Sequence, residues 1–283
     1  MHIFKSAEKL SSYLNTLRSQ NKNVTIGFVP TMGALHKGHT SLIEECVKNN
    51  DISVCSIFVN PTQFGESKDL ETYPKPIEKD IESLLNVNCS ILFLPEVNQV
   101  YPETYEPIVY DLEGVDLKIE GASRPGHFQG VCNVIDRFLT IVEPNKAYFG
   151  QKDFQQTVVV KKLVKILNSK TEIIVIPIKR EPHGLAMSSR NIRLSEKGRK
   201  NAAFIYKALS QLKEDVSEQP LDEAVEKAKQ FISAQKGARI DYLLTIDASS
   251  FQEVTHIEDA EEIAVVTVVE YEGVRLLDNI ILT

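Results

Sequence analysis

The 283-residue sequence contains only four cysteines, and no two of them form a C-x-x-C pair. This spacing argues against zinc sites and dithiol redox centres, so we expect Cys46, Cys55, Cys89 and Cys132 to be buried or unreactive thiols. No apolar run approaches the roughly 20 residues that a membrane span needs, and the polar N-terminal segment lacks the apolar stretch of a signal peptide. We therefore expect a cytoplasmic protein.

Common catalytic signatures are also missing. The sequence has no G-x-S-x-G nucleophile elbow, no G-x-x-x-x-G-K-[ST] phosphate loop and no cysteine in an evident activating setting. Covalent catalysis and the P-loop mode of ATP binding are therefore disfavoured. The chemistry that remains works by positioning substrates and stabilising charge.

Excess positive charge is absent as well. The net charge of −7 argues against broad binding to nucleic acid or to an anionic membrane, so small-molecule partners are favoured. The 42% hydrophobic and 25% charged residues are the balance of an ordinary globular protein, and we find no internal repeat or low-complexity tract. The length allows one large domain or two unequal ones.

The first 178 residues alternate short β-rich runs with segments of helical periodicity. This alternation predicts a doubly wound, Rossmann-like α/β domain, a parallel sheet with helices on both faces. The expected strands, which read as buried on both sides, are 24–29, 52–59, 91–94 and 173–178. The expected helices are 40–49, 77–85, 128–142 and 154–167.

The pattern changes after about residue 180. Helices and strands are then grouped, which predicts a smaller α+β lid domain over residues 179–283. The boundary is expected between Pro177 and Met187, and the cleft between domains is a usual place for a small-molecule site. The expected helices are 196–212 and 221–235, and the expected strands are 240–246, 263–270 and 274–282.

The segment GFVPTMGALHKGHTSLI, residues 27–43, runs from a buried strand through a turn at Gly33 into an H-x-G-H that opens a helix. Ligands of open α/β sheets bind beyond the carboxyl ends of the strands, and a helix N-terminus attracts phosphate. His36 and His39 share one helical face and each can donate a hydrogen bond to a phosphate oxygen, while Gly38 lets a ligand come close. The segment predicts a nucleotide site.

Two alternatives stay open for this histidine pair. Histidines near a helix start often cap the helix or pack against it. A zinc site is the other alternative, but zinc ligands on a helix more often use i, i+4 spacing with a third ligand, and no Glu adjoins these histidines as in H-E-x-x-H. The upstream strand and turn favour the nucleotide.

The second expected strand runs directly into Asn60 and Gln63 of the sequence NPTQF. Both amides donate and accept hydrogen bonds, so together they suit the hydroxyls and carboxylate of a small polyol acid. A plain Asn-Pro turn is the alternative. Because two adjacent strands end in polar loops, we expect one shared pocket.

Two further segments carry candidate polar groups. Asp80 lies on an expected short helix, and a lone carboxylate near phosphate indicates Mg²⁺, although most acids in such a segment are simply solvated. The Gly-rich stretch GASRPGHFQG carries Arg124 and His127. An arginine there clamps a substrate carboxylate or pairs with a surface acid, and both alternatives stay open.

Another strand, glycine turn and helix start follow in AYFGQKDFQQTVVV, residues 147–160. Its turn, residues 150–153, is suited to hold adenosine by backbone contacts. Lys152 would supply a cation for phosphate, and Gln156, one helical turn on, would face the same space. A lysine in a turn is ordinarily just solvated, so Lys152 means little alone.

The segment LAMSSRN, residues 185–191, combines two hydroxyls with a guanidinium. Ser188, Ser189 and Arg190 therefore predict a mobile phosphate clamp that closes on ATP. A helix cap is the alternative role for the serines, but Ser195 is better placed to cap the helix that follows.

These motifs together carry a resemblance. PTMGALHKGH resembles the H-x-G-H signature of the class I aminoacyl-tRNA synthetase and nucleotidylyltransferase superfamily, and residues 27–191 are similar to the pantothenate synthetase (pantoate–β-alanine ligase) family. The resemblance implies an ATP-dependent ligase that joins pantoate to β-alanine through a pantoyl-adenylate and releases AMP and pyrophosphate. It also implies Mg²⁺, a role in pantothenate and coenzyme A biosynthesis, and a homodimer.

The resemblance also assigns residues. Gln63 would contact both pantoate and β-alanine, and Gln156 would bind pantoate. Asp80 would bind magnesium, but the acidic residue that often precedes it is Lys79 here, which leaves the second metal contact open. The catalytic residues would be His36, His39, Lys152 and Arg190. The ATP-binding residues would be Met32, Gly33, Ala34, Leu35, His36, Lys37, Gly38, His39, Gly150, Gln151, Lys152, Asp153, Lys179, Met187, Ser188, Ser189 and Arg190. The substrate-binding residues would be Asn60, Gln63, Arg124, His127 and Gln156.

Two other functions stay open from the residues alone. A nucleotidylyltransferase that moves AMP or CMP onto a phosphate-bearing substrate would need extra cations, whereas Asn60, Gln63 and Gln156 suit neutral hydroxyls and one carboxylate. A nucleotide-binding regulatory module without turnover is the other alternative.

Overall fold

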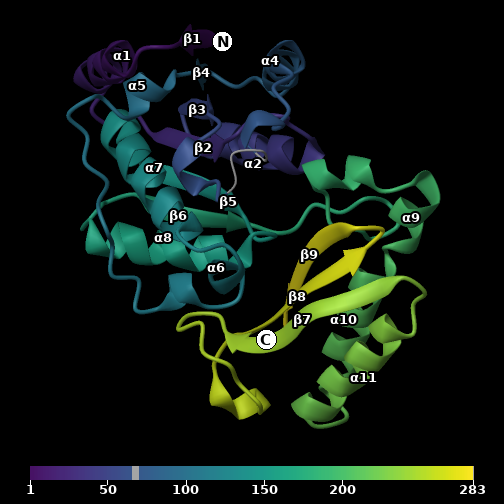
Figure 1. The fold of residues 1–283 in the computed structure, drawn as a ribbon. Coiled ribbons are helices and arrows are strands. Elements are labelled where there is room, and N and C mark those ends of the chain that lie inside the picture. The colour runs from purple at the N-terminus through teal and green to yellow at the C-terminus, as the bar shows by residue number, and fades with distance from the viewer. Residues whose placement is uncertain (66–69, 283) are drawn as a thin grey trace. The chain divides into compact units, whose positions relative to one another are not determined.

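The computed structural model describes residues 1–65 and 70–282, and the chain forms two compact units (Figure 1). The first unit comprises Met1–Gly150 and Gln155–Ile176, and the second comprises Gln151–Phe154 and Pro177–Thr283. The chain therefore passes into the second unit for four residues after Gly150, returns, and leaves the first unit for good after Ile176.

A six-stranded parallel sheet forms the centre of the first unit, in the order β1-β4-β3-β2-β5-β6. The near-continuous apolar sequences of its inner strands suit a sheet that is covered on both faces. The strands are β1 (His2–Phe4), β2 (Ile26–Thr31), β3 (Ile52–Ile57), β4 (Ile91–Phe93), β5 (Lys146–Gly150) and β6 (Glu172–Ile176).

Helices connect these strands. They are α1 (Ala7–Gln20), α2 (Lys37–Lys48), α4 (Ile77–Asn86), α5 (Val97–Val100), α6 (Glu120–Ser123), α7 (His127–Val142) and α8 (Phe154–Ile166). The described part of this unit also contains the short 3-10 helices η1 (Pro61–Gln63) and η2 (Val115–Leu117).

Successive residues of β2 point to opposite faces of the sheet and meet different helices. Phe28 packs edge-on against Phe138 of α7, with ring centroids 5.5 Å apart. Val29 joins a separate buried cluster with Ile43 of α2 and Leu84 of α4. Complete burial of side chains of this size stabilises the fold by about 1.5–3 kcal/mol each. The expected α/β fold with helices on both faces is confirmed.

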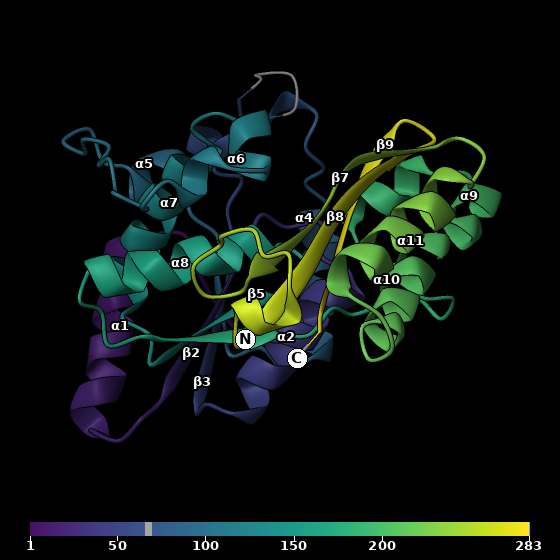
Figure 2. The same cartoon turned by 90° about the horizontal axis from the view of Figure 1, so that it is seen from below.

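The second unit packs helices on an antiparallel sheet of order β7-β8-β9 (Figure 2). Leu209 and Ile232, on its two longer helices, join Val265 and Val269 of the central strand in one buried cluster. Its helices are α9 (Glu196–Asn201), α10 (Phe204–Asp215) and α11 (Leu221–Ser233), and its strands are β7 (Ala238–Asp247), β8 (Ile263–Tyr271) and β9 (Val274–Ile281). The described part of the unit also contains the 3-10 helices η3 (Ser189–Arg193) and η4 (Ile257–Asp259).

The structure adds elements that the sequence pattern did not indicate. Strand β1 has only three residues, and α1 buries only Leu10 and Leu14 completely, so neither gives a strong periodic signal. The sequence predicted a single helix over 196–212, but the structure has two: α9 ends at Asn201 and α10 begins at Phe204. Within the described residues, none of the helices is both long and apolar enough to span a bilayer.

Candidate active site

Strand β2 lies between β3 and β5, and this position marks the switch in the winding of the sheet. The chain goes from β2 to β3 and β4 on one side, and later returns to place β5 on the other side of β2. Ligands of doubly wound sheets bind outside the carboxyl ends of the strands at such a switch. The histidine loop follows β2, and the turn that contains Lys152 follows β5. Each motif therefore comes directly after one of the two strands that meet at the winding switch.

His36 and His39 form a capping box at the start of α2. The Nδ1 atom of His36 accepts the backbone N–H of Gly38 at 3.1 Å, and Nδ1 of His39 accepts the backbone N–H of His36 at 3.4 Å. The two imidazole rings lie 4.1 Å apart between centroids. The capping role considered for these histidines is therefore confirmed.

Capping by Nδ1 has a consequence for the other ring nitrogen. An imidazole nitrogen that accepts a hydrogen bond carries no proton, so in the neutral ring the proton sits on Nε2, which is a donor. Both histidines are thus fixed as Nε2–H donors beside a helix N-terminus, whose partial positive charge favours an anion. The capping role and the predicted phosphate-binding role are compatible.

The turn before α2 is held in an uncommon backbone conformation. Gly33 has a φ of 84° and Ala34 a φ of 51°, in the left-handed region that favours glycine. A Cβ at Gly33 would also lie only 2.9 Å from Ile57 Cγ2 and 3.0 Å from Asp80 Oδ2. This position therefore requires glycine for two independent reasons.

Asp80, in the first turn of α4, contacts this turn directly. Its Oδ2 accepts the backbone N–H of Ala34 at 2.9 Å, and its Oδ1 accepts that of Leu35 at 2.7 Å. The residue is only 1% exposed. The two bonds offset the cost of burying the carboxylate and fix the conformation of the turn.

These contacts bear on the magnesium predicted at Asp80. Mg²⁺ prefers carboxylate and phosphate oxygens in open octahedral geometry, but both oxygens of Asp80 already accept backbone N–H groups and the residue is nearly inaccessible. The described residues contain no group of three or more His, Cys, Asp or Glu side chains that could hold a metal ion. The side chains present therefore fit a protein-bound magnesium ion poorly, and the role of Asp80 as its ligand stays a prediction.

Asn60, which follows β3 and caps η1, is only 1% exposed and makes several internal hydrogen bonds. Its Nδ2 donates to Gln63 Oε1 at 3.1 Å and to the Gly130 carbonyl at 3.2 Å, and its Oδ1 accepts the Tyr101 hydroxyl at 2.9 Å. Gln63 Nε2 lies 3.1 Å from Met32 Sδ in the turn before α2. Asn60 therefore fixes the orientation of the Gln63 amide.

His127 joins the same group of residues. One ring nitrogen, Nε2, lies 3.1 Å from Arg124 NH1, and the other, Nδ1, lies 2.9 Å from the Gln63 carbonyl. The guanidinium can only donate and the carbonyl can only accept, so Nδ1 carries the proton and Nε2 accepts. A Cβ at Gly130 would lie 2.2 Å from the Thr62 carbonyl, so α7 and η1 pack at closest approach here. Asn60, Gln63, Arg124 and His127 thus form one hydrogen-bonded chain.

A cavity of about 550 Å³ opens beyond the carboxyl ends of β2, β3 and β4. Met32, Val59 and Leu94, which follow these strands, contribute to its largely apolar lining together with Asp80. His36, His39 and Gln63 are not among the residues that line it. The cavity therefore adjoins the histidine turn but does not include the predicted catalytic groups.

The turn after β5 carries Lys152, whose Nζ lies 3.7 Å from Asp153 Oδ1. Gln156, in the first turns of α8, is partly buried, whereas its neighbour Gln155 is 6% exposed. Gln155 is structural, because its Nε2 donates to the Val115 and Lys118 carbonyls. Gln156 is therefore the more accessible of the two glutamines, and its role in binding pantoate stays a prediction.

The predicted clamp segment has its own local structure. The backbone N–H of Met187 donates to the Lys179 carbonyl at 2.9 Å, which pairs these two residues in a hairpin. Ser188 caps η3 through a 3.3 Å bond from the Arg190 backbone N–H, and Arg190 is exposed. The expectation that Ser195 caps the following helix is confirmed, since Ser195 Oγ accepts the Gly198 backbone N–H at 2.9 Å.

The predicted site residues thus fall into three groups. His36 and His39 lie on the turn held by Asp80, and the four polar residues from Asn60 to His127 form the hydrogen-bonded chain described above. Lys152, Lys179 and Arg190, which are cations of the predicted ATP-binding set, belong to the second unit, whereas Lys37 of the same set is the first residue of α2 in the first unit. Sequence reasoning missed Tyr101, whose hydroxyl donates to Asn60 Oδ1. The two residues are 41 positions apart, and nothing in the sequence near Tyr101 indicates the contact.

Known proteins match this chain along its whole length. Residues 2–281 match the family model described as pantoate-beta-alanine ligase. The pantothenate synthetase of Cytophaga hutchinsonii is 44% identical over 271 residues, 95% of each chain, and that of Azobacteroides pseudotrichonymphae is 42% identical over 281 residues, 99% of each chain.

Solved structures agree with this assignment. The pantothenate synthetase of Thermus thermophilus has a TM-score of 0.90 at 35% identity, with 99% of both chains covered. The pantoate-beta-alanine ligase of Francisella tularensis, complexed with beta-gamma ATP and beta-alanine, has a TM-score of 0.78 at 37% identity and covers 99% of this chain and 97% of its own. Matches of this extent and identity establish that the chain belongs to the pantoate–β-alanine ligase family.

Proposed function

We propose that this protein condenses pantoate with β-alanine at the expense of ATP. The pantoate carboxylate attacks the α-phosphate of ATP, so that a carboxylate oxygen–phosphorus bond forms and the bond to pyrophosphate breaks. The β-alanine amine then attacks the carbonyl carbon of the pantoyl-adenylate, which forms the amide, releases AMP and gives up a proton to solvent. The products are pantothenate, AMP and pyrophosphate.

One observation carries this proposal beyond family membership. The two histidines at the carboxyl end of β2 are fixed as Nε2–H donors at a helix N-terminus, next to the winding switch of the sheet. Donors that are fixed before the reaction stabilise charge that develops on phosphate without any reorganisation. His36 and His39 would therefore act on the triphosphate, and the turn of residues 32–38 that carries them would border the nucleotide.

The first unit would also bind the acid substrate. Asn60 fixes the orientation of the Gln63 side-chain amide, so the positions of its donor and its acceptor are set. An amide held in this way selects a ligand with a matching hydroxyl or carboxylate over one that lacks it. Arg124 and His127 adjoin it and would contribute positive charge and a further polar contact near the pantoate carboxylate. Gln156 would add the second amide that holds pantoate.

The second unit would supply cations for the phosphates. Lys152, Lys179 and Arg190 are placed on two segments of this unit, and Gly150–Asp153 and Met187–Ser189 would contribute backbone and hydroxyl contacts to ATP. Two hydrogen bonds order the second segment locally, one from the Arg190 backbone N–H to Ser188 Oγ and one from the Met187 backbone N–H to the Lys179 carbonyl. Mg²⁺ bound with ATP would shield the charge of the phosphates.

Exchange between labelled pyrophosphate and ATP tests the function. We expect exchange that requires pantoate and that occurs in the absence of β-alanine, together with net AMP formation once β-alanine is added. Exchange that requires a phosphorylated acceptor in place of pantoate would indicate a nucleotidylyltransferase. Nucleotide binding with neither exchange nor AMP formation would indicate a regulatory module.

Two further properties are part of the proposal. The family resemblance implies a homodimer, which size-exclusion chromatography with light scattering would test. The cytoplasmic location expected from the sequence stays a prediction.

A further inference from the structure

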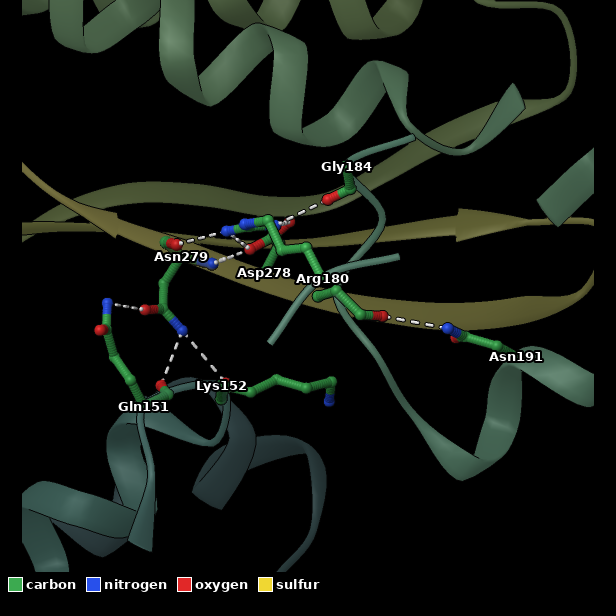
Figure 3. Close-up of polar contacts among 8 residues, drawn as sticks. Gln151, Lys152, Arg180, Gly184, Asn191, Asp278 and Asn279 are labelled. Carbon is green, nitrogen blue, oxygen red and sulfur yellow. Dashed lines mark hydrogen bonds and ion pairs between the residues drawn. The ribbon is translucent and has the colours of Figure 1, made fainter. Parts of the chain in front are cut away.

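Two neighbouring residues of β9, Asp278 and Asn279, contact the two segments of the second unit that carry the predicted phosphate cations (Figure 3). The first segment is the turn Gln151–Asp153, which contains Lys152. The second is the segment 179–190, which contains Lys179 and Arg190. Both contacts come from strand residues that are 2–3% exposed.

Asn279 holds the first segment through every polar group of its side chain. Its Nδ2 donates to the carbonyls of Gln151 at 3.0 Å and Lys152 at 3.1 Å, and its Oδ1 accepts from Gln151 Nε2 at 3.0 Å (Figure 3). Two successive carbonyls held by one amide fix the peptide plane between them. The direction in which the Lys152 side chain leaves the backbone is therefore set by Asn279.

Asp278 holds the second segment through Arg180. The guanidinium makes a bidentate pair with the carboxylate, NH1 to Oδ2 at 2.7 Å and NH2 to Oδ1 at 2.8 Å, and also donates to the Gly184 carbonyl at 3.1 Å. The Arg180 guanidinium stacks on the Tyr206 ring at 3.7 Å from its centroid. Burial raises the pKa of the Asp278 carboxyl, and the pairing with Arg180 opposes that shift.

The segment held by Arg180 is a hairpin that presents the other cations. Arg180 pairs with Ala186 across it, and the next pair outward is Lys179 with Met187. Asn191, 2% exposed, donates from Nδ2 to the Ala186 carbonyl at 3.0 Å and thereby ties η3, which contains Arg190, to the same hairpin. Lys179 and Arg190 thus lie on one locally braced segment.

We propose that Asp278 and Asn279 are positioning residues for the activation of ATP, which join the Lys152 turn and the 179–190 hairpin into one rigid set of phosphate cations. The backbone bond between the two residues links the two contacts, and the Asn279 N–H also donates to Asp278 Oδ1 at 2.8 Å. A cation displaced by about 1 Å from its productive position costs up to roughly 10²-fold in rate. The inference rests on the proposed function.

The substitution Asn279→Asp tests the first contact with little change in shape. The carboxylate still accepts from Gln151 Nε2, but it presents an oxygen instead of an amide donor to the carbonyls of Gln151 and Lys152. We expect the rate of pantoate-dependent pyrophosphate–ATP exchange to fall by about 10- to 100-fold, with the KM for pantoate unchanged. Arg275 lies on the same strand, β9, and makes an exposed ion pair with Asp241 of β7. Arg275→Ala, which removes this ion pair, is the matched control and should retain full exchange.

A double-mutant cycle with Lys152→Ala separates positioning from a general structural role. If Asn279 acts through Lys152, adding Asn279→Asp to Lys152→Ala lowers exchange by much less than it does in the wild-type protein. Additive losses, or an equal rise in the KM for pantoate, would overturn the inference. Absence of exchange in the wild-type protein would instead refute the proposed function, so the two failures are distinguishable.

Discussion

The Asp80 carboxylate accepts the backbone N–H of Leu35 at 2.7 Å, so a buried acid on α4 holds the turn that leads into the histidine pair. Its other oxygen accepts the backbone N–H of Ala34, a residue with a φ of 51°. A non-glycine residue in that region costs on the order of 1 kcal/mol or more, so the turn needs an outside partner to keep its shape. Asp80 is that partner.

Asp80→Asn should therefore impair ATP activation through the turn. The amide retains one acceptor but directs an NH₂ group at one of the two backbone N–H donors, which leaves that donor unpaired. We expect a fall of about 1–3 kcal/mol in the free energy of unfolding and at least a roughly tenfold fall in pyrophosphate exchange. Urea titration and the exchange assay measure the two effects.

The magnesium dependence of the same variant separates the two roles considered for Asp80. If the residue only holds the turn, the Mg²⁺ concentration for half-maximal exchange stays unchanged in Asp80→Asn. A several-fold increase in that concentration would show that the carboxylate binds the ion. Glu78→Gln, at an exposed position in the same helical turn, is the control and should change neither quantity.

The two nitrogens of His39 can be tested separately. Asparagine places an acceptor near the position of Nδ1 and keeps the cap, whereas glutamine places a donor near the position of Nε2. We expect His39→Asn to retain stability while exchange falls by about 10²–10³-fold, the usual loss for one donor to transition-state charge. His39→Gln should retain more exchange than His39→Asn, and near-normal exchange in His39→Asn or His39→Ala would refute the role of Nε2.

Asn60→Asp tests whether Asn60 orients Gln63. The substitution replaces the Nδ2 donor by an oxygen that faces Gln63 Oε1 and the Gly130 carbonyl. We expect the amide of Gln63 to lose its fixed orientation, so that the KM for pantoate rises about tenfold while the KM for ATP is unchanged. The free energy of unfolding should fall by about 1–3 kcal/mol or more, because a buried donor is lost.

A buried asparagine elsewhere in the first unit is the control for this experiment. Asn133, in α7, donates from Nδ2 to the carbonyls of Ile108 and Gln129 and is 5% exposed. Asn133→Asp should therefore lower stability by a similar amount without changing the KM for pantoate. If both variants raised that KM equally, the effect would be one of general destabilisation.

The sequence predicted the parts of this fold that local pattern encodes. Apolar runs marked β2 and β3, and the helical spacing of Leu42, Ile43 and Cys46 marked α2, because each element buries a face that its own residues define. The three-residue β1 was not predicted, since its pairing with β4 depends on residues 89 positions away. The order of the strands was likewise beyond local pattern.

The same limit applies to the site. The histidine turn was recognisable because strand, glycine turn and capped helix are contiguous in sequence. Nothing near Asp80 reveals that its carboxylate meets Ala34, 46 residues earlier, and nothing near Asn279 reveals its contact with Gln151, 128 residues earlier. Candidate binding residues can be predicted from local motifs, whereas the residues that hold them in place are defined by tertiary contacts.

Burial protects the four thiols of this protein from alkylation. All four cysteines are buried, and burial raises the pKa of Cys46 and of Cys132 from 9.0 to about 12. The reactive thiolate is therefore scarce at pH 8, and we expect no rapid reaction of the native protein with iodoacetamide, whereas all four thiols should react in urea. Because these pKa values are raised in the folded state, the stability that they contribute should be complete below pH 9 and fall as the pH rises towards 12. A rapid, stoichiometric labelling of one cysteine in the native protein, located by peptide mass spectrometry, would contradict this protection.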